Sequence, residues 1–330
     1  MSENIYIFSN GELKRKQNTI YFEVKDGNHK YLPVENIREI HLFGEVILNK
    51  DALEFLSQKE IILHFYNYYG YYVGSFYPRE HYNSGYILLK QVEHYLDFEK
   101  RRYLALKFVE GAISNIITVL SYYRRKGINL ESLDKINALY QNLFYQNTIE
   151  EIMAIEGKVR EIYYSEFNKI IENKEFIMDK RSKKPPENQI NALISFGNSL
   201  LYSYILSEIY KTHLDPRIGY LHATNFRRFT LNLDIAEIFK PIIVDRVIFY
   251  ITNKNMLSSR DFEEKLNGIY LKESGRKIFI SKIEEKLRTT VFYKKLGKNV
   301  SYRRLIRMEL YKLEKHLIGD EKYYPLISEW

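Results

Sequence analysis

One stretch of the sequence, residues 213–246, combines a histidine, carboxylates and arginines around an expected loop. An Asp-Pro pair and a glycine mark the loop and place His222 near its end. Asp234 and Glu237 follow three residues apart at the start of an expected helix, so both project from one face. One imidazole with such carboxylates can coordinate a divalent cation: oxygen ligands suit Mg²⁺, and the imidazole shifts the preference toward Mn²⁺ or another transition metal.

Arg227 and Arg228 lie between this histidine and these acids, where they can grip phosphate through bidentate hydrogen bonds. The residues alone leave a plainer interpretation open. Asp234 and Glu237 can be first-turn acids favoured by the helix dipole, and His222 can be a buried histidine satisfied by a backbone carbonyl.

The composition of the 330-residue chain excludes several classes of site. It contains no Cys, which rules out disulfides, thiol nucleophiles and Cys-ligated zinc or iron–sulfur centres. The 50 Lys and Arg against 42 Asp and Glu give a formal net charge of +8, which points toward polyanionic partners. The N-terminus lacks the features of a signal peptide, and no uninterrupted apolar run is long enough to span a bilayer. We therefore expect a soluble, cytoplasmic protein.

The chain changes character near residue 85. Residues 1–85 hold 9 basic and 11 acidic side chains, a net charge of −2, whereas residues 86–330 hold 41 and 31, a net charge of +10. The first part shows short β-prone runs separated by Asn10-Gly11 and Asp26-Gly27, a pattern typical of hairpin-connected strands, with one helix near 51–58. The second part has helical periodicity. The fold class expected is therefore α+β, with a small, mostly-β domain over 1–85 and a larger all-α domain over 86–330.

The expected elements are as follows. Strands are expected at 5–8, 19–24, 37–42, 46–48, 61–65 and 71–76. Helices are expected at 85–123, 130–145, 148–172, 188–212, 234–252, 279–290 and 301–317, the third beginning at Thr148 with acids in its first turn. A short hairpin is expected near Ser274-Gly275.

Three segments, at 153–164, 191–197 and 213–246, together resemble a known family in their order and spacing. The family is the CRISPR-associated integrase of the adaptation module, the first-numbered Cas proteins. The Tyr-rich pieces at 43–45 and 69–74 also look like the amino-terminal domain of that family. The resemblance covers nearly the whole chain, although each motif alone is short.

The resemblance implies a prokaryotic, metal-dependent DNA endonuclease and integrase that inserts short foreign DNA into a CRISPR array by 3′-hydroxyl transesterification. It implies that Glu156, His222 and Glu237 hold Mg²⁺ or Mn²⁺ and are catalytic, with Asp234 as an auxiliary acid. Without the resemblance, Glu156 would be taken for a solvated surface glutamate. Lys240 stands where the family commonly has Arg.

The resemblance also implies partners: double-stranded DNA from both the foreign fragment and the CRISPR repeat, a second copy of the chain joined through the β-rich domain, and a small adaptation partner protein. No membrane is involved. Contacts to DNA are expected mainly at backbone phosphates, because incoming fragments vary in sequence. The basic residues expected to make them are Arg124, Arg125, Lys183, Lys184, Arg227, Arg228 and Lys240, although each cluster can instead be an ordinary solvated surface.

Two alternatives stay open. A metal-independent tyrosine recombinase would use one of the 30 tyrosines as nucleophile, but His222 and the following arginines have the wrong offset for the His-x-x-Arg activators of that class. A non-catalytic nucleic-acid scaffold would need none of the three proposed ligands.

Overall fold

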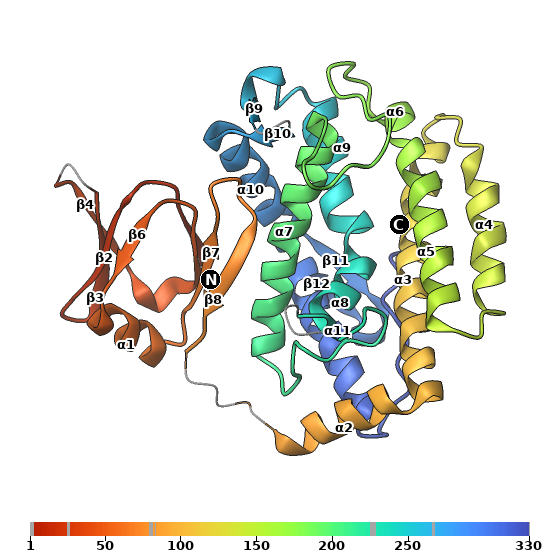
Figure 1. Ribbon diagram of the computed structural model, residues 1–330, viewed down its shortest axis with the longest axis horizontal. Coiled ribbons are helices and arrows are strands. Elements are labelled where there is room, and N and C mark those ends of the chain that lie inside the picture. The colour runs from red at the N-terminus through yellow and green to blue at the C-terminus, as the bar shows by residue number, and fades with distance from the viewer. Residues whose placement is uncertain are drawn as a thin grey trace. The chain divides into compact units, whose positions relative to one another are not determined.

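The computed structural model describes residues 3–24, 27–78, 82, 84–224, 229–265 and 268–329. The chain divides into two compact units, residues 1–83 and 84–330, each of which is described by itself. The first unit is rich in strands and the second in helices, so the predicted α+β fold class is confirmed (Figure 1).

The first unit consists of two four-stranded sheets. In one sheet, the first three strands are parallel and the fourth is antiparallel. Its order is β1 (Glu3–Ile7), β5 (Ile37–Leu42), β7 (Ile62–Tyr66) and β8 (Tyr72–Phe76). The order of the other sheet is β4 (His29–Leu32), β3 (Thr19–Val24), β2 (Gly11–Lys16) and β6 (Val46–Leu48).

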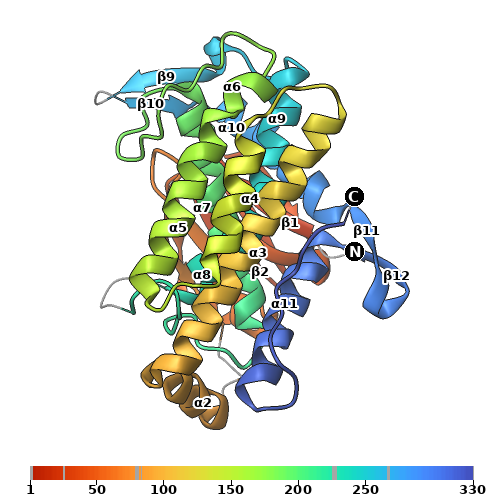
Figure 2. The same ribbon diagram turned by 90° about the vertical axis from the view of Figure 1, so that its right-hand side faces the viewer.

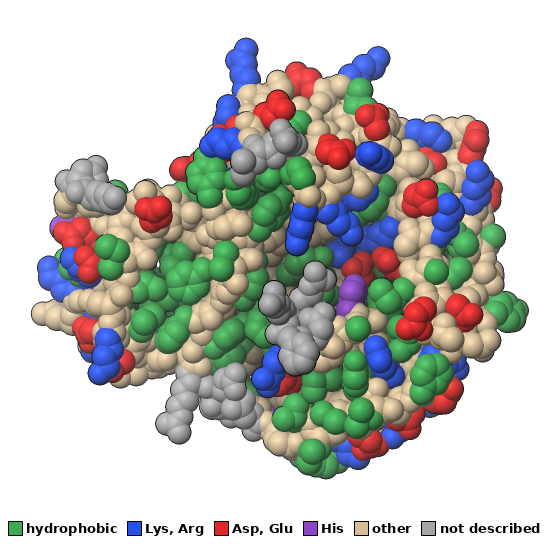
Figure 3. Space-filling model, viewed as in Figure 1, with side chains coloured by type: hydrophobic (Ala, Val, Ile, Leu, Met, Phe, Trp, Pro, Cys, Tyr) green, Lys and Arg blue, Asp and Glu red, His purple; other side chains and the backbone are tan. Residues whose placement is uncertain are grey.

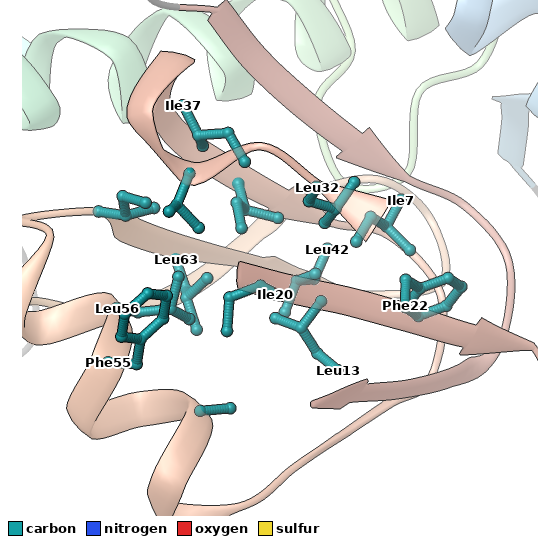
Figure 4. Close-up of a cluster of buried hydrophobic side chains, with 14 residues drawn as sticks. Ile7, Leu13, Ile20, Phe22, Leu32, Ile37, Leu42, Phe55, Leu56 and Leu63 are labelled. Atoms are coloured by element: carbon teal, nitrogen blue, oxygen red, sulfur yellow. The ribbon is translucent and has the colours of Figure 1, made fainter. Parts of the chain in front are cut away.

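Apolar side chains of both sheets meet in one buried cluster (Figure 4). Leu13 and Ile20 come from one sheet and Leu42 and Leu63 from the other. Phe55 and its neighbours join from α1 (Lys50–Gln58). The alternation of strand side chains places one face of each sheet in this core and leaves the opposite face for other contacts.

The sequence analysis did not predict β2 and β4. Its prediction of a hairpin turn at Asn10-Gly11 is wrong, because β1 and β2, the strands on either side of these two residues, belong to different sheets. Gly11 instead permits a close approach of two strands. A Cβ atom at this position would lie 2.2 Å from the carbonyl oxygen of Glu23. The predicted Asp26-Gly27 turn falls partly on residues outside those described.

The second unit is built mainly from helices (Figures 1 and 2). They are α2 (Gly85–Leu96), α3 (Phe98–Arg125), α4 (Ser132–Leu143), α5 (Ile149–Ser165), α6 (Phe167–Ile170), α7 (Gln189–Tyr210), α8 (Leu231–Phe239), α9 (Arg246–Asn253), α10 (Glu273–Arg288) and α11 (Tyr302–Leu317). Figure 2 shows α3, α4 and α5 side by side. Thr148 caps α5 in a capping box with Glu151, which confirms the predicted start of that helix.

α7 is the central helix of this unit, since it is buried along nearly all its length. The short helix α8 packs against both α7 and α3. By length and composition α3 could cross a membrane, but 67% of its apolar window is buried within the protein, as is typical of a core helix.

The helix predicted over 234–252 is interrupted. α8 ends at Phe239, a π-helical turn follows over Pro241–Asp245, and α9 begins at Arg246. Pro241 has no N–H to donate to the carbonyl four residues earlier, so the hydrogen-bond ladder is broken at this point. The ladder resumes with a wider step, from the Asp245 N–H to the Lys240 carbonyl at 3.1 Å.

The second unit also contains two hairpins, which the all-α prediction missed. They are β9 (Phe262–Lys265) with β10 (Gly268–Leu271), and β11 (Thr290–Tyr293) with β12 (Lys298–Ser301). The hairpin predicted at Ser274-Gly275 is wrong, because these residues form the first turn of α10. Gly275 serves packing: a Cβ atom there would lie 2.6 Å from the Leu271 side chain.

Candidate active site

Asp234 organises the loop that carries His222. Its buried carboxylate accepts backbone N–H bonds from Tyr220 at 2.5 Å, from Leu221 at 3.0 Å and from His222 at 3.0 Å. The loop approaches so closely that a Cβ atom at Gly219 would lie 2.8 Å from the Asp234 carboxylate. Asp234 is therefore a structural anchor of the loop and not a solvated first-turn acid.

The His222 ring is oriented by the same carboxylate, with Nδ1 lying 2.7 Å from Asp234 Oδ1. Burial alone would lower the pKa of His222, but the hydrogen bond with Asp234 and the charges of Asp234 and Glu237 outweigh burial and raise it. Because Nδ1 is engaged by Asp234, Nε2 is the nitrogen left to bind a ligand. A carboxylate that holds one nitrogen while the other faces a metal is the usual arrangement of metal-binding histidines.

Arg160 joins the two glutamates predicted as ligands. Its Nε donates to Glu156 Oε1 at 2.8 Å, one turn earlier on α5, and its terminal nitrogen donates to the Glu237 carboxylate of α8. The same nitrogen lies 3.4 Å from the Glu237 carbonyl oxygen, the atom that Pro241 cannot bond. The break in the helix therefore frees a backbone acceptor at the site.

Glu237 is buried between two cations, because Lys240 donates to its other carboxylate oxygen. Burial would raise the pKa of Glu237, but the charges of Lys240 and Arg160 lower it to about 2. Glu237 is thus ionised at neutral pH. The Lys240 amino group also lies 5.2 Å from the centre of the Tyr202 ring, so its charge is balanced by contacts within the protein.

Glu156 and Glu237 both pair with the guanidinium group of Arg160. The His222 ring is close enough to Glu237 for the charge of that carboxylate to raise the His222 pKa. Their ligand atoms do not form a tight group: among the described residues, the ligand atoms that all lie within 4.8 Å of one another belong to Glu39, His41 and His64, in the first unit. Two carboxylates and one oriented imidazole are nevertheless a donor set that fits a divalent cation. Arg160 bridges the two carboxylates.

Sequence reasoning assigned no role to Arg160, although its i,i+4 spacing from Glu156 is the pattern of a helical ion pair. It also missed Asp245, which is fully buried at the end of the π-helical turn. Burial raises the pKa of Asp245 to about 7, against the opposing effect of the Arg160 charge. Its position inside the apolar run 242–251 is the sequence signal that could have indicated its burial.

The basic residues predicted to contact DNA differ in their exposure and in their partners. Lys183 and Lys184 are exposed on a basic loop. Asn191 of α7 holds this loop in place. Its side chain accepts a hydrogen bond from the Ser182 N–H at 3.2 Å and donates one to the Lys180 carbonyl at 2.8 Å. Desolvation and the nearby charges of Arg181 and Lys240 lower the pKa of Lys183.

The other expected contacts are less uniform. Arg124 and Arg125 end α3 at the surface, where Arg124 lies 3.7 Å from Asp134. Lys240 is buried and paired with Glu237. Arg227 and Arg228 lie outside the described residues. In the space-filling view, basic and acidic side chains gather around a histidine between α7 and α5 (Figure 3).

Comparison with known proteins shows to which family this chain belongs. A family model described as CRISPR associated protein Cas1 matches residues 5–285. The chain belongs to the Cas1 family. A CRISPR-associated endonuclease Cas1 of Thermodesulfovibrio yellowstonii is 59% identical over the full length of both chains, and that of Thermotoga maritima is 50% identical over 97% of this chain and 98% of its own. The resemblance inferred from the sequence is confirmed.

Solved Cas1 structures share the fold. The structure of the Thermotoga maritima Cas1 protein superposes with a TM-score of 0.89, covers 99% of this chain and 100% of its own, and is 48% identical. A casposase bound to an integration product also superposes with a TM-score of 0.89, over 100% of this chain and 95% of its own. That casposase is 21% identical, so it shows a shared fold alone.

Proposed function

We propose that this Cas1 protein is a metal-dependent DNA endonuclease and integrase that inserts short foreign DNA into a CRISPR array in the prokaryotic cytoplasm. The observation that carries the proposal is the convergence of Glu156 and Glu237 on Arg160, beside an imidazole that Asp234 orients. The relatives named above are endonucleases, which supports the same activity.

Glu156, His222 and Glu237 would hold Mg²⁺ or Mn²⁺. A bound ion supplies charge that stabilises the phosphate transition state and the leaving oxygen. The protein itself keeps Glu237 ionised through Arg160 and Lys240 and holds His222 through Asp234. Ordered ligands of this kind reduce the reorganisation needed when DNA binds.

In the proposed reaction, a DNA 3′-hydroxyl gives up its proton and its oxygen bonds to a phosphorus atom of the repeat strand. The bond from that phosphorus to the 3′-oxygen of the neighbouring nucleotide breaks, and the departing 3′-oxygen takes up a proton. No covalent protein intermediate forms. Double-stranded DNA, a second copy of the chain and a small adaptation partner protein are the proposed partners. One chain of a solved Cas6-RT-Cas1--Cas2 complex shares the fold over 36% of its own length, with a TM-score of 0.84 and 17% identity.

The proposal is tested by joining a DNA fragment with 3′-hydroxyl ends to a repeat-containing plasmid, with the partner protein and Mn²⁺. Glu156→Ala, His222→Ala and Glu237→Ala should each reduce joining and cleavage at least 100-fold while DNA affinity changes less than threefold. The matched control is Glu161→Ala, an exposed glutamate of the same helix that pairs with Lys158. Normal joining by the Glu237→Ala protein would overturn the metal assignment.

The two alternatives give different results in the same assay. A tyrosine recombinase would keep its activity in EDTA, whereas the proposed enzyme would lose it. A non-catalytic scaffold would give no joining above background with the unaltered protein, and the three substitutions would then change nothing.

A further inference from the structure

The first unit contains a second group of potential metal ligands, unrelated to the proposed active site. Glu39 and His41 lie two residues apart on β5, so they project from the same face of the sheet. His64 is the direct cross-strand neighbour of His41 on β7. This face is opposite to the one that carries Ile40, Leu42 and Leu63 into the hydrophobic core.

All three side chains are buried, and their ligand atoms lie within 4.8 Å of one another. Nε2 of His41 lies 3.6 Å from Glu39 Oε1, and Nε2 of His64 lies 3.5 Å from Glu39 Oε2. These separations are long for hydrogen bonds. They match the edge of a tetrahedral zinc site, about 3.4 Å when the bonds to nitrogen and oxygen are about 2.0–2.1 Å.

The outer nitrogens of both rings are engaged by hydroxyl groups. Nδ1 of His41 lies 2.8 Å from the Tyr66 hydroxyl, and Nδ1 of His64 lies 2.7 Å from the Ser75 hydroxyl. The Ser75 hydroxyl is held in turn by that of Tyr72 at 2.8 Å. In the tautomers whose Nδ1–H donates to its hydroxyl, both Nε2 lone pairs are directed toward the Glu39 side and can bind the same cation as the carboxylate.

The two histidine rings lie against each other. The two rings are stacked, with their centres 4.9 Å apart. One divalent ion can therefore be bound by both Nε2 atoms and the Glu39 carboxylate together.

We propose that Glu39, His41 and His64 bind a divalent transition metal of the zinc class. Two imidazoles and one carboxylate are a ligand set that Zn²⁺ accepts, with a fourth position for water or another donor. The ion would link β5 to β7, the two central strands of their sheet, and would stabilise the first unit. This site is independent of Glu156, His222 and Glu237.

The test uses the full-length chain with Glu156→Gln and His222→Asn, so that the proposed active-site metal does not contribute. After metal removal and loading with Zn²⁺, elemental analysis should find about one Zn²⁺ per chain. Co²⁺ loading should give the visible absorption of a tetrahedral site. Glu39→Gln and His64→Gln, added singly, should weaken Zn²⁺ binding at least tenfold. His29→Gln, an exposed histidine of the same unit, is the matched control and should leave binding unchanged.

Zn²⁺ should also raise the thermal midpoint of the background protein but not that of the Glu39→Gln protein. Zn²⁺ binding that persists at full strength in the Glu39→Gln protein would overturn the proposal, because the ion would then lie elsewhere. The absence of Co²⁺ absorption in the background protein would overturn it too, even if the substituted chains failed to fold. Glu39, His41 and His64 would then be a buried polar cluster that binds no metal.

Discussion

At the scale of single residues, Glu237 is costly to bury and yet is held by two cations. Burying an ion pair gives little net stability, because desolvation offsets the attraction between the charges. Arg160 and Lys240 nevertheless both donate to Glu237. A stable core would be served as well by apolar side chains, so this arrangement is better explained by a need for an ionised carboxylate at a defined position.

Asp245 behaves in the opposite way, and its titration predicts a pH-dependent stability. Burial raises its pKa to about 7, so the folded protein holds a proton that the unfolded chain releases near pH 4. The stability of the folded state should therefore be complete below about pH 4, fall as the pH rises to about 7, and then level off. Asp245→Asn cannot ionise and should lose this decline.

The measurement is chemical unfolding of both proteins between pH 5 and pH 8. The stability of Asp245→Asn relative to the unaltered protein should increase by a few kcal/mol between pH 5 and pH 8. Asp134→Asn, at an exposed position on α4, is the control and should show no such trend. A constant difference between Asp245→Asn and the unaltered protein would contradict the prediction.

At the scale of elements, the sequence predicted the helices and strands whose signals come from residues close together in the chain. The capped start of α5 and most strands with alternating apolar residues were found because these signals depend on near neighbours. The packing role of Gly275 was missed because it depends on contacts outside its own helix. The break at Pro241 is local, and the missing N–H of the proline could have predicted it. β4 was missed since three of its four residues are exposed and show no buried stripe.

The candidate site was predictable only in part for the same reason. His222, Asp234 and Glu237 lie close in sequence and stood out as a pattern, whereas Glu156 was recognised only through the family resemblance. The joining of Glu156 to Glu237 by Arg160 requires α5 and α8 to meet. The group of Glu39, His41 and His64 likewise depends on strand register, which the sequence did not give.

Asn115 of α3 fixes the end of α8 that follows Glu237. Its buried side-chain amide donates to the carbonyls of Ile238 at 2.9 Å and Leu326 at 3.0 Å, and its oxygen accepts the Ser328 N–H at 2.8 Å. Asn115→Ala leaves these buried groups without partners. It should reduce the free energy of unfolding by about 1–3 kcal/mol.

Urea unfolding measures this loss, and Asn137→Ala on the exposed face of α4 is the matched control, expected to change stability by less than about 0.5 kcal/mol. Since α8 carries Glu237, the Asn115→Ala protein should also lose part of its joining activity. Equal stability of the two variants would show that the Asn115 bonds do not hold α8 in place.

At the scale of the whole molecule, charge is divided between the two units in a way that predicts where DNA binds. Residues 1–85 carry a net charge of −2 and residues 86–330 a net charge of +10. Binding to DNA phosphates releases counterions, so affinity falls with salt in proportion to the number of phosphates contacted. The dependence on salt should therefore arise from the second unit, and Lys183 and Lys184 are exposed there.

Replacing Lys183 and Lys184 together with Ala should lower the affinity for duplex DNA at 0.1 M salt about tenfold or more. It should also reduce the slope of log K against log salt by about 1–2, because each phosphate contact contributes about 0.9 to that slope. The control replaces Lys30 and Lys50, exposed lysines of the first unit, which removes the same charge from the chain. If both pairs changed the slope equally, binding would follow total charge and not the basic loop that Asn191 holds on α7.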